Sequence, residues 1–195
     1  ELFVGLTNVE GQMQIEEGES VRFVQDIRTL ELAVIDRSDN NVDSVTVIPL
    51  SKIKEAANDE TPIQSDLLPF EISVNRYLQN ARVRRAAADD DNPATDGQGK
   101  LWFAEEVRAG TGVDNDAKVD LSAAYVTLRK KGEKDPLTTR LVSLVFAAEN
   151  QPERVTVDGR EYDLFLRFRR TYKPYTITLN DVRKVDYMGT STPRD

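Results

Sequence analysis

The chain has 195 residues, of which 39% are aliphatic or aromatic and 31% are charged, and its net charge is −8. This length can form one domain or two small ones with a buried core, and the negative charge disfavours binding to nucleic acid or to an anionic membrane surface. Because the sequence contains no Cys and no His, it excludes a disulfide, a thiolate nucleophile, a Cys/His metal or haem ligand and a Ser–His dyad within this chain.

Alternating apolar residues predict two strand segments near the start, Val21–Ile27 and Leu30–Asp36. The letters DRSDNN at Asp36–Asn41 are typical of a hairpin turn, and Val45–Pro49 reads as the second arm. Residues Ser51–Asn58 contain no Gly or Pro and begin with a residue suited to an N-cap. They predict a single short helix near 51–58.

The middle of the chain alternates again at Pro69–Asn75, which predicts a strand that continues through Tyr77. Ala86–Gly99 is small, acidic and contains Gly and Pro, so we expect an exposed flexible loop there. Leu101–Val107, with the only Trp of the chain, reads as another strand.

The second half predicts two more hairpins. The first joins Leu121–Leu128 to Arg140–Phe146. The second joins Arg154–Val157 to Tyr162–Phe168 through Asp158-Gly159, a pair that favours a type I′ turn. A break at Thr171–Pro174 then separates Tyr162–Phe168 from a further strand, Tyr175–Leu179.

These elements together predict a mainly β protein, with roughly ten to thirteen strands in an antiparallel β-sandwich or barrel-like stack. Pro69–Asn75 and Pro174–Asn180 match in residue character at an offset of 105 positions, which suggests a pseudo-duplicated β unit. The alternative is a chance similarity between two strands. The chain therefore reads as one β domain over 1–195, or as two diverged halves, 1–88 and 100–195, joined by the loop 86–99.

No run of about 18 apolar residues is present, so the sequence predicts no transmembrane segment. The chain begins at Glu1 rather than Met and stops at Asp195 without a closing element. We therefore expect it to be an excised fragment of a longer protein.

The letters RRTYKPYTITL at Arg169–Leu179, followed by Asp181, Tyr187, Gly189-Thr190 and Pro193, resemble the ResB-like family of system II cytochrome c biogenesis membrane proteins. The strand start Leu68-Pro69-Phe70 is also similar to that family. The resemblance is dense over Asp158–Asp195 and thin before Leu121.

The resemblance implies a non-catalytic domain on the extracytoplasmic, periplasmic face of a bacterial membrane. Its implied partners are a haem-transfer membrane protein and apocytochrome c, and the full-length protein would be membrane-anchored. The family's haem-associated His residues have no counterpart here, so we expect no cofactor in this fragment and haem handling only by the full complex. The alternative is a generic secreted or cell-surface β-sandwich that binds a ligand or carbohydrate.

Two basic clusters are the candidate partner contacts. They could bind an acidic partner, haem propionates or phosphate, or they could form cross-strand ion pairs with the abundant carboxylates, which the net charge favours. The first cluster is Arg82, Arg84 and Arg85, and the second is Arg167, Arg169, Arg170 and Lys173 with Tyr172 and Tyr175 interleaved.

Acidic groups give weaker candidates. A calcium loop counted from Asp89 fails, because it places Ala94 at position 6 and Lys100 at position 12. Asp114–Asp116 fails in the same way. The glutamates Glu105, Glu106 and Glu161 could supply a glycosidase pair, but so acidic a chain offers such pairs by chance. We expect no metal site and no catalytic residue.

Overall fold

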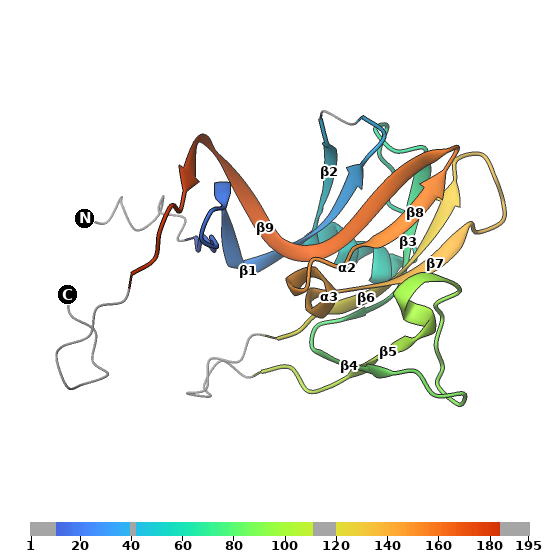
Figure 1. Cartoon of the computed structure of the whole chain (residues 1–195). Helices are drawn as coiled ribbons and strands as arrows, with labels where there is room; N and C mark the ends of the chain where they lie inside the picture. Colours follow the sequence, from blue (N-terminus) through green and yellow to red (C-terminus); the bar gives the residue numbers. More distant parts are fainter. Residues whose placement is uncertain (1–10, 40–41, 111–119, 184–195) are drawn as a thin grey trace, which may run out of the picture. The chain divides into compact units, whose positions relative to one another are not determined.

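The computed structural model describes residues 11–39, 42–110 and 120–183, and these contain nine strands in sheets of four, three and two (Figure 1). The mainly β, antiparallel class predicted from the sequence is confirmed. The strands are β1 Ser20–Asp36, β2 Ser44–Pro49, β3 Phe70–Leu78, β4 Ala81–Arg85, β5 Trp102–Glu106, β6 Ala123–Lys130, β7 Thr138–Ser143, β8 Glu153–Val157 and β9 Arg160–Thr178.

The chain divides into two compact units, one formed by Thr29–Phe168 and the other by Glu1–Arg28 with Arg169–Asp195. The long strands β1 and β9 each begin in one unit and end in the other. This division does not follow the halves 1–88 and 100–195 suggested by the sequence, and the proposed duplication stays a prediction.

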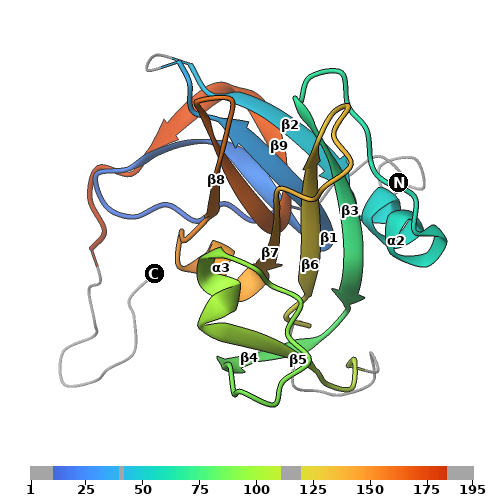
Figure 2. The ribbon, with the colours of Figure 1, turned by 90° about the vertical axis from the view of Figure 1, so that its right-hand side faces the viewer.

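The larger unit is built around one main core that two sheets enclose. The four-stranded sheet has the order β2-β1-β9-β8 and the three-stranded sheet the order β3-β6-β7 (Figure 2). Apolar residues at alternate positions of both sheets meet in this core, as period-two patterning requires. Its fully buried members include Leu32, Phe70, Ile72, Leu128, Tyr162 and Leu164.

A helix and tight turns complete this core. The helix α2 Leu50–Asp59 buries Ile53 and Ala56, which confirms the helix predicted near 51–58. Its N-cap is Pro49 rather than Ser51. The β8–β9 hairpin turns at Asp158 and Gly159, both with positive φ, as the type I′ signature predicts.

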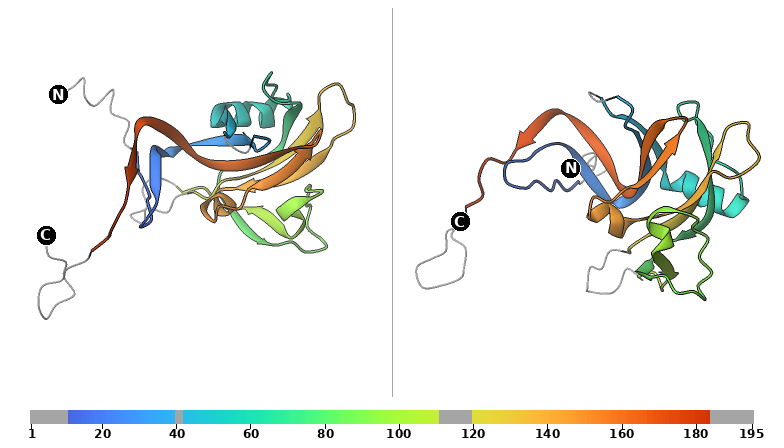
Figure 3. Two further views of the ribbon diagram at one scale, coloured as in Figure 1. Left: turned by 45° about the horizontal axis from the view of Figure 1, so that its top comes forward. Right: turned by 45° about the vertical axis from the view of Figure 1, so that its right-hand side comes forward.

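A smaller core lies beneath the hairpin of β4 and β5. Phe103 and Ala104 pack there against Tyr125, Leu141 and Phe146. The 3-10 helix η1 Gly97–Lys100 follows the acidic segment 86–96 and contacts β5, β7 and β8 (Figure 3). The end of the acidic segment therefore lies beside β7, where the Thr95 N–H donates to the Thr139 carbonyl.

In the smaller unit, the first part of β1 runs beside the last part of β9. The Ser20 and Thr178 hydroxyl oxygens are 2.7 Å apart, and the Leu179 N–H donates to the Glu19 carbonyl. Gln12 exchanges two backbone hydrogen bonds with Gln25 on β1. This unit is thus a β ribbon, and the name β1–β9 ribbon is used below for 20–28 with 169–178.

The structure corrects two predicted boundaries. The break expected at Thr171–Pro174 is absent, because β9 is continuous from Arg160 to Thr178. The fixed φ of proline is compatible with an extended strand wherever its missing N–H costs no ladder bond. The expected strand at Arg140–Phe146 ends at Ser143, where α3 Leu144–Ala148 begins. Ser143 accepts a hydrogen bond from the Val145 N–H and caps that helix.

The two similar stretches lie in different surroundings. Phe70, Ile72 and Val74 on β3 are buried, whereas Tyr175 and Ile177 on β9 are exposed. The described residues contain fewer strands than the ten to thirteen predicted, because some segments predicted as separate strands are continuous. Val21–Ile27 and Leu30–Asp36 are an example. A single long strand, β1, covers both of those segments.

Candidate functional site

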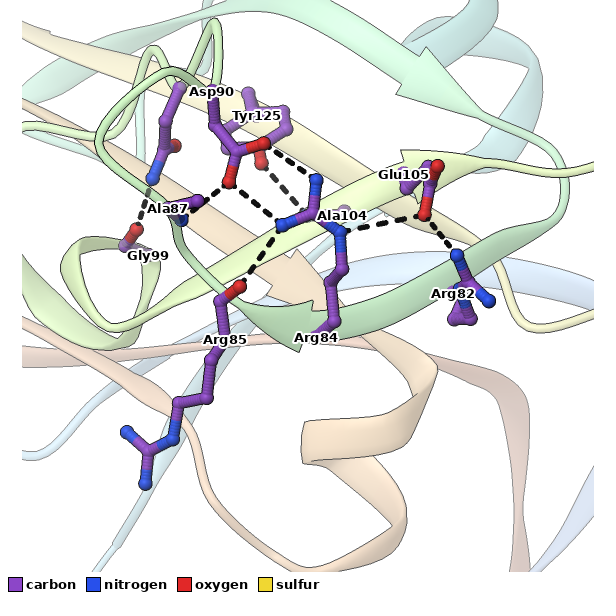
Figure 4. A network of polar contacts seen from close by, with 10 residues as sticks. Arg82, Arg84, Arg85, Ala87, Asp90, Gly99, Ala104, Glu105 and Tyr125 are labelled. Carbon is purple, nitrogen blue, oxygen red and sulfur yellow. Dashed lines mark hydrogen bonds and ion pairs between the residues drawn. The ribbon is translucent and has the colours of Figure 1, made fainter.

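The first basic cluster is held by carboxylates on its own hairpin and on the next loop. Arg84 donates through both terminal nitrogens to Asp90, at 2.6 and 2.8 Å, and Arg82 donates to Glu105 at 2.6 Å (Figure 4). Glu105 lies on β5, opposite Arg82 on β4. These contacts are the cross-strand and loop ion pairs that a net charge of −8 favours.

The Arg84–Asp90 pair organises the start of the acidic segment. Asp90 also accepts a hydrogen bond from the Ala87 N–H at 2.6 Å, and these donors hold the pKa of Asp90 below its usual range. The Arg82 guanidinium, together with Arg84, likewise lowers the pKa of Glu105. Both carboxylates therefore stay ionised as arginine partners.

Arg85 points away from this network, as Figure 4 shows. Its guanidinium carbon lies 4.3 Å from the centroid of the Trp102 ring, in a cation–π contact. Arg85 is exposed, as is Arg82, whose side chain is 67% exposed.

Arg167, from the second predicted cluster, lies inside the larger unit rather than on its surface. Its side chain is 7% exposed, and its Nε donates to Glu31 Oε1 at 2.9 Å across β9 and β1. A partner would have to displace Glu31 to pair with the Arg167 guanidinium. Arg167 therefore stabilises the fold rather than forming a contact surface.

The other members of that cluster lie on the β1–β9 ribbon, beside two residues of β1 that the sequence patterns did not select. Phe23 meets Tyr172 edge to face with ring centroids 5.7 Å apart. The Arg170 guanidinium lies 4.1 Å from the Phe23 ring centre, and that of Arg22 lies 5.5 Å from the Tyr172 ring centre. The two rings therefore lie side by side with one arginine over each, in the order Arg170, Phe23, Tyr172 and Arg22, and we call these four residues the stacked row below.

The ribbon also carries apolar groups in solvent. Tyr172 is 48% exposed, Tyr175 is 56% exposed and Ile177 is 43% exposed. Arg169 pairs with Asp26 at 3.2 Å, and Lys173 is partly exposed. Along β9, no Asp or Glu occurs between Asp163 and Asp181, although the chain as a whole has 34 acidic residues.

A third charged group was missed by the sequence patterns because its members lie far apart in the chain. Arg140 on β7 and Glu153 on β8 are both buried, and the Arg140 Nη2 lies 2.7 Å from Asp96. The Glu153 carboxylate accepts the Gln98 N–H at 2.9 Å, and its Oε2 is 3.5 Å from Arg140 Nη1. Burial raises the pKa of Glu153 from 4.5 to about 7.

The acidic candidates do not assemble into a metal site. Asp90, Asp91 and Asp96 pair with Arg84, Arg76 and Arg140, respectively. Within 11–39, 42–110 and 120–183, no three acidic side chains are grouped to hold a metal ion. Asp114–Asp116 lies outside the described residues.

The remaining candidates are placed as follows. Glu105 and Glu106 lie on β5 and Glu161 on β9, strands that belong to different sheets. None of the helices in the described ranges combines the length and the apolar character needed to cross a membrane.

The two basic clusters fall in different compact units, except that Arg167 belongs to the larger unit with the first cluster. Arg82, Arg84 and Arg85 belong to the larger unit, and Arg169, Arg170, Tyr172, Lys173 and Tyr175 to the smaller one. Comparison of this sequence with protein-family models and with curated proteins finds no match.

Proposed function

We propose that this chain is a non-catalytic docking domain that binds a protein partner through the β1–β9 ribbon. The observation that carries the proposal is the stacked row of Arg22, Phe23, Arg170 and Tyr172, with Tyr175 and Ile177 exposed on the same ribbon. Arginine and tyrosine are enriched at protein interfaces and among the residues that contribute most of the binding energy.

The charge of β9 indicates the character of the partner. The strand has four cationic residues and no acidic one from Leu164 to Asn180. Arg167 and Arg169 pair with carboxylates of β1, and Arg170 lies over the Phe23 ring. A complementary partner surface would carry carboxylates and apolar side chains. The rest of the chain is acidic and would repel such a surface, so the ribbon offers it the most favourable approach.

The resemblance to the ResB-like family concerns the same residues. The letters RRTYKPYTITL occupy Arg169–Leu179, which is the part of β9 in the ribbon. We therefore propose the extracytoplasmic face of a bacterial membrane as the location, and a haem-transfer membrane protein or apocytochrome c as the partner. Haem would be bound by the assembled complex and not by this chain, which has no His or Cys to ligate it.

Site-specific photo-crosslinking in the native host tests this proposal. A photo-reactive residue is introduced at Tyr175 in the ribbon, and a matched one at Leu101, which is 59% exposed in the larger unit. The expected result is a crosslink from position 175, absent from position 101, to a cytochrome c maturation component.

Three outcomes would count against the proposal. Equal labelling from both positions would remove the ribbon as the docking surface. A strong crosslink from position 175 to an unrelated protein would keep the docking role and reject the ResB-like assignment. Binding to a carbohydrate that Tyr172→Ala abolishes, without any protein crosslink, would favour the ligand-binding β-sandwich instead.

A further inference from the structure

The turn Asp96–Gln98 closes directly over two buried charged side chains. The Gln98 N–H donates to Glu153 Oε1 at 2.9 Å, and Asp96 accepts from Arg140 at 2.7 Å. Gly97 has φ +71°, and a Cβ built there would lie 2.0 Å from Glu153 Oε2 and 2.4 Å from Arg140 Nη1. The backbone of the turn is therefore packed onto the charged groups with no side chain between them.

The charges in this group do not balance when every member is ionised. The single guanidinium of Arg140 faces two carboxylates, and it lies closer to Asp96, at 2.7 Å, than to Glu153, at 3.5 Å. A proton on Glu153 would leave one cation and one anion. Since Glu153 is buried, the unbalanced negative charge falls on the group that solvent can stabilise least.

The other elements packed around Glu153 do not restore the balance. Its opposite residue on β9 is Leu164, and the recess beside it is lined by Phe146, Phe165 and Leu166. From η1, the Lys100 charge acts on Asp96. Gln151 is uncharged, and Arg140 remains the only cation in contact with the Glu153 carboxylate within the described residues.

We propose that Glu153 makes the Asp96–Gln98 turn a pH-sensitive latch. The turn stays closed over β7 and β8 in acid, when Glu153 is protonated, and opens more readily as the pH rises to neutrality and Glu153 ionises. Opening of the turn exposes Glu153 to water, where the ionised carboxylate is stable. It also uncovers Leu141, because Gly99 closely covers the Leu141 side chain in the closed state.

The direction follows from proton linkage. Burial raises the pKa of Glu153 to about 7 in the closed turn, and exposure returns it toward the ordinary value of 4.5. The closed state therefore binds the proton more tightly, and closing is most favoured in acid. The preference for the closed state decreases as the pH rises from 4.5 to 7 and does not change further above pH 7. Over this range the opening equilibrium changes by up to roughly a hundredfold.

Amide hydrogen exchange of the whole chain, followed by NMR from pH 5 to 8 and corrected for intrinsic exchange rates, tests the latch. The informative amides are Gln98, which donates to Glu153, and Thr95, which donates to the Thr139 carbonyl. Their protection factors should fall by between tenfold and a hundredfold as the pH rises. The amide of Val126 in the central strand β6 should stay more strongly protected than these two at every pH, because it exchanges only through global unfolding.

Two variants separate the latch from simple burial. Glu153→Gln keeps the shape and the acceptor for Gln98 but cannot titrate, so protection of Gln98 should become independent of pH. Asp96→Asn leaves Arg140 to Glu153 alone, which should lower the midpoint of the pH dependence. The matched control is Glu71→Gln, which removes a carboxylate on β3 far in sequence from the turn.

Constant protection of Gln98 in the unsubstituted chain, or an unchanged pH trend in Glu153→Gln, would overturn the proposal. If Glu153→Gln fails to fold, the carboxyl carbon of Glu153 is titrated by NMR in the unsubstituted chain. A midpoint near 7 supports the latch, and a midpoint below about 5, near the ordinary range for glutamate, overturns it.

Discussion

Arginines serve two different purposes in the two compact units of this chain. In the larger unit, Arg140 and Arg167 are buried, and each guanidinium faces a buried carboxylate, Glu153 and Glu31 respectively. In the smaller unit, Arg22 and Arg170 stack on the rings of Tyr172 and Phe23.

Buried ion-paired arginines stabilise the fold, whereas arginines stacked on partly exposed rings can bind a partner. A buried pair cannot exchange its carboxylate for a ligand without leaving a charge unsolvated. A guanidinium stacked on a ring keeps donors in its plane for a new acceptor. Arginine letters alone did not distinguish these two settings, whereas burial and the identity of the neighbouring group do.

The largest expected effect comes from breaking a buried pair. Arg167→Met leaves Glu31 buried and unpaired, and the free energy of unfolding should fall by about 3–5 kcal/mol in chemical denaturation. Arg169→Met is the matched control on the same strand. The Arg169 side chain is 47% exposed in its pair with Asp26, so this substitution should lower the free energy of unfolding by less than about 1 kcal/mol.

The comparison of those two variants can fail in a definite way. Equal losses from Arg167→Met and Arg169→Met would mean that burial does not distinguish the two settings. Adding Glu31→Gln to Arg167→Met should recover part of the loss, because the unpaired charge is then removed.

The next effect is the pH dependence of stability at Glu153. Its pKa is raised in the folded chain from 4.5 to about 7, so the folded state binds the proton more tightly than the unfolded state. Stability from this group is present in acid and lost as the pH rises from 4.5 to 7, by up to about 3 kcal/mol. Asp96, whose pKa is lowered chiefly by the Gly97 N–H, acts in the opposite direction.

The quantity to measure is the difference in the free energy of unfolding between the unsubstituted chain and Glu153→Gln. Denaturation of the unsubstituted chain and of Glu153→Gln is compared at each pH from 4.5 to 8, so that all other carboxylates cancel. Relative to the variant, the unsubstituted chain should lose stability toward neutral pH. A stability difference that is constant with pH would mean that the pKa of Glu153 is not shifted by folding. A loss of stability of the unsubstituted chain toward acid, relative to the variant, would mean that the buried carboxylate is stabilised as an ion.

A smaller loss is expected where the backbone lies on the buried charges. Gly97→Ala places a Cβ against Glu153 and Arg140 and also strains a positive φ, so it should cost about 2–3 kcal/mol. Gly132→Ala has a similar φ of +82° but nothing within 4 Å of the added carbon, and should cost only about 1 kcal/mol. Thermal or chemical unfolding of the two variants isolates the packing contribution.

The smallest effect on stability is expected in the stacked row. Arg22→Ala removes one exposed cation–π contact with Tyr172 and should change the free energy of unfolding by less than about 1 kcal/mol. The same substitution should weaken capture of the partner several-fold. Arg85→Ala, which removes a similar contact with Trp102 in the larger unit, should leave capture unchanged.

Much of the fold could be predicted, because strands such as Phe70–Leu78 and turns such as Asp158-Gly159 carry their signal locally. The predictions of secondary structure are wrong where tertiary contacts, rather than local sequence, determine the conformation. Pro174 lies within a continuous strand where the sequence indicated a break, and Leu144–Ala148 becomes helical after the Ser143 cap although its apolar letters continue the run of the predicted strand.

The contact surface could be predicted in part. Tyr172 and Tyr175 were selected with the neighbouring arginines, but Arg22 and Phe23 lie about 150 positions earlier in the chain and only strand pairing brings them together. Arg167 was selected for its charge, and its burial against Glu31 cannot be deduced from local alternation. The group of Asp96, Arg140 and Glu153 has no sequence motif for the same reason.

The most direct test of the division between the two settings is capture of the native partner by the double variant Tyr172→Ala with Tyr175→Ala. Both side chains are exposed on the β1–β9 ribbon. We predict that capture is lost while the chain stays folded, with the free energy of unfolding lowered by no more than about 2 kcal/mol through the lost contacts of Tyr172 with Phe23 and Arg22. Undiminished capture, or a loss that appears only together with unfolding, would contradict the assignment of the ribbon as the docking surface.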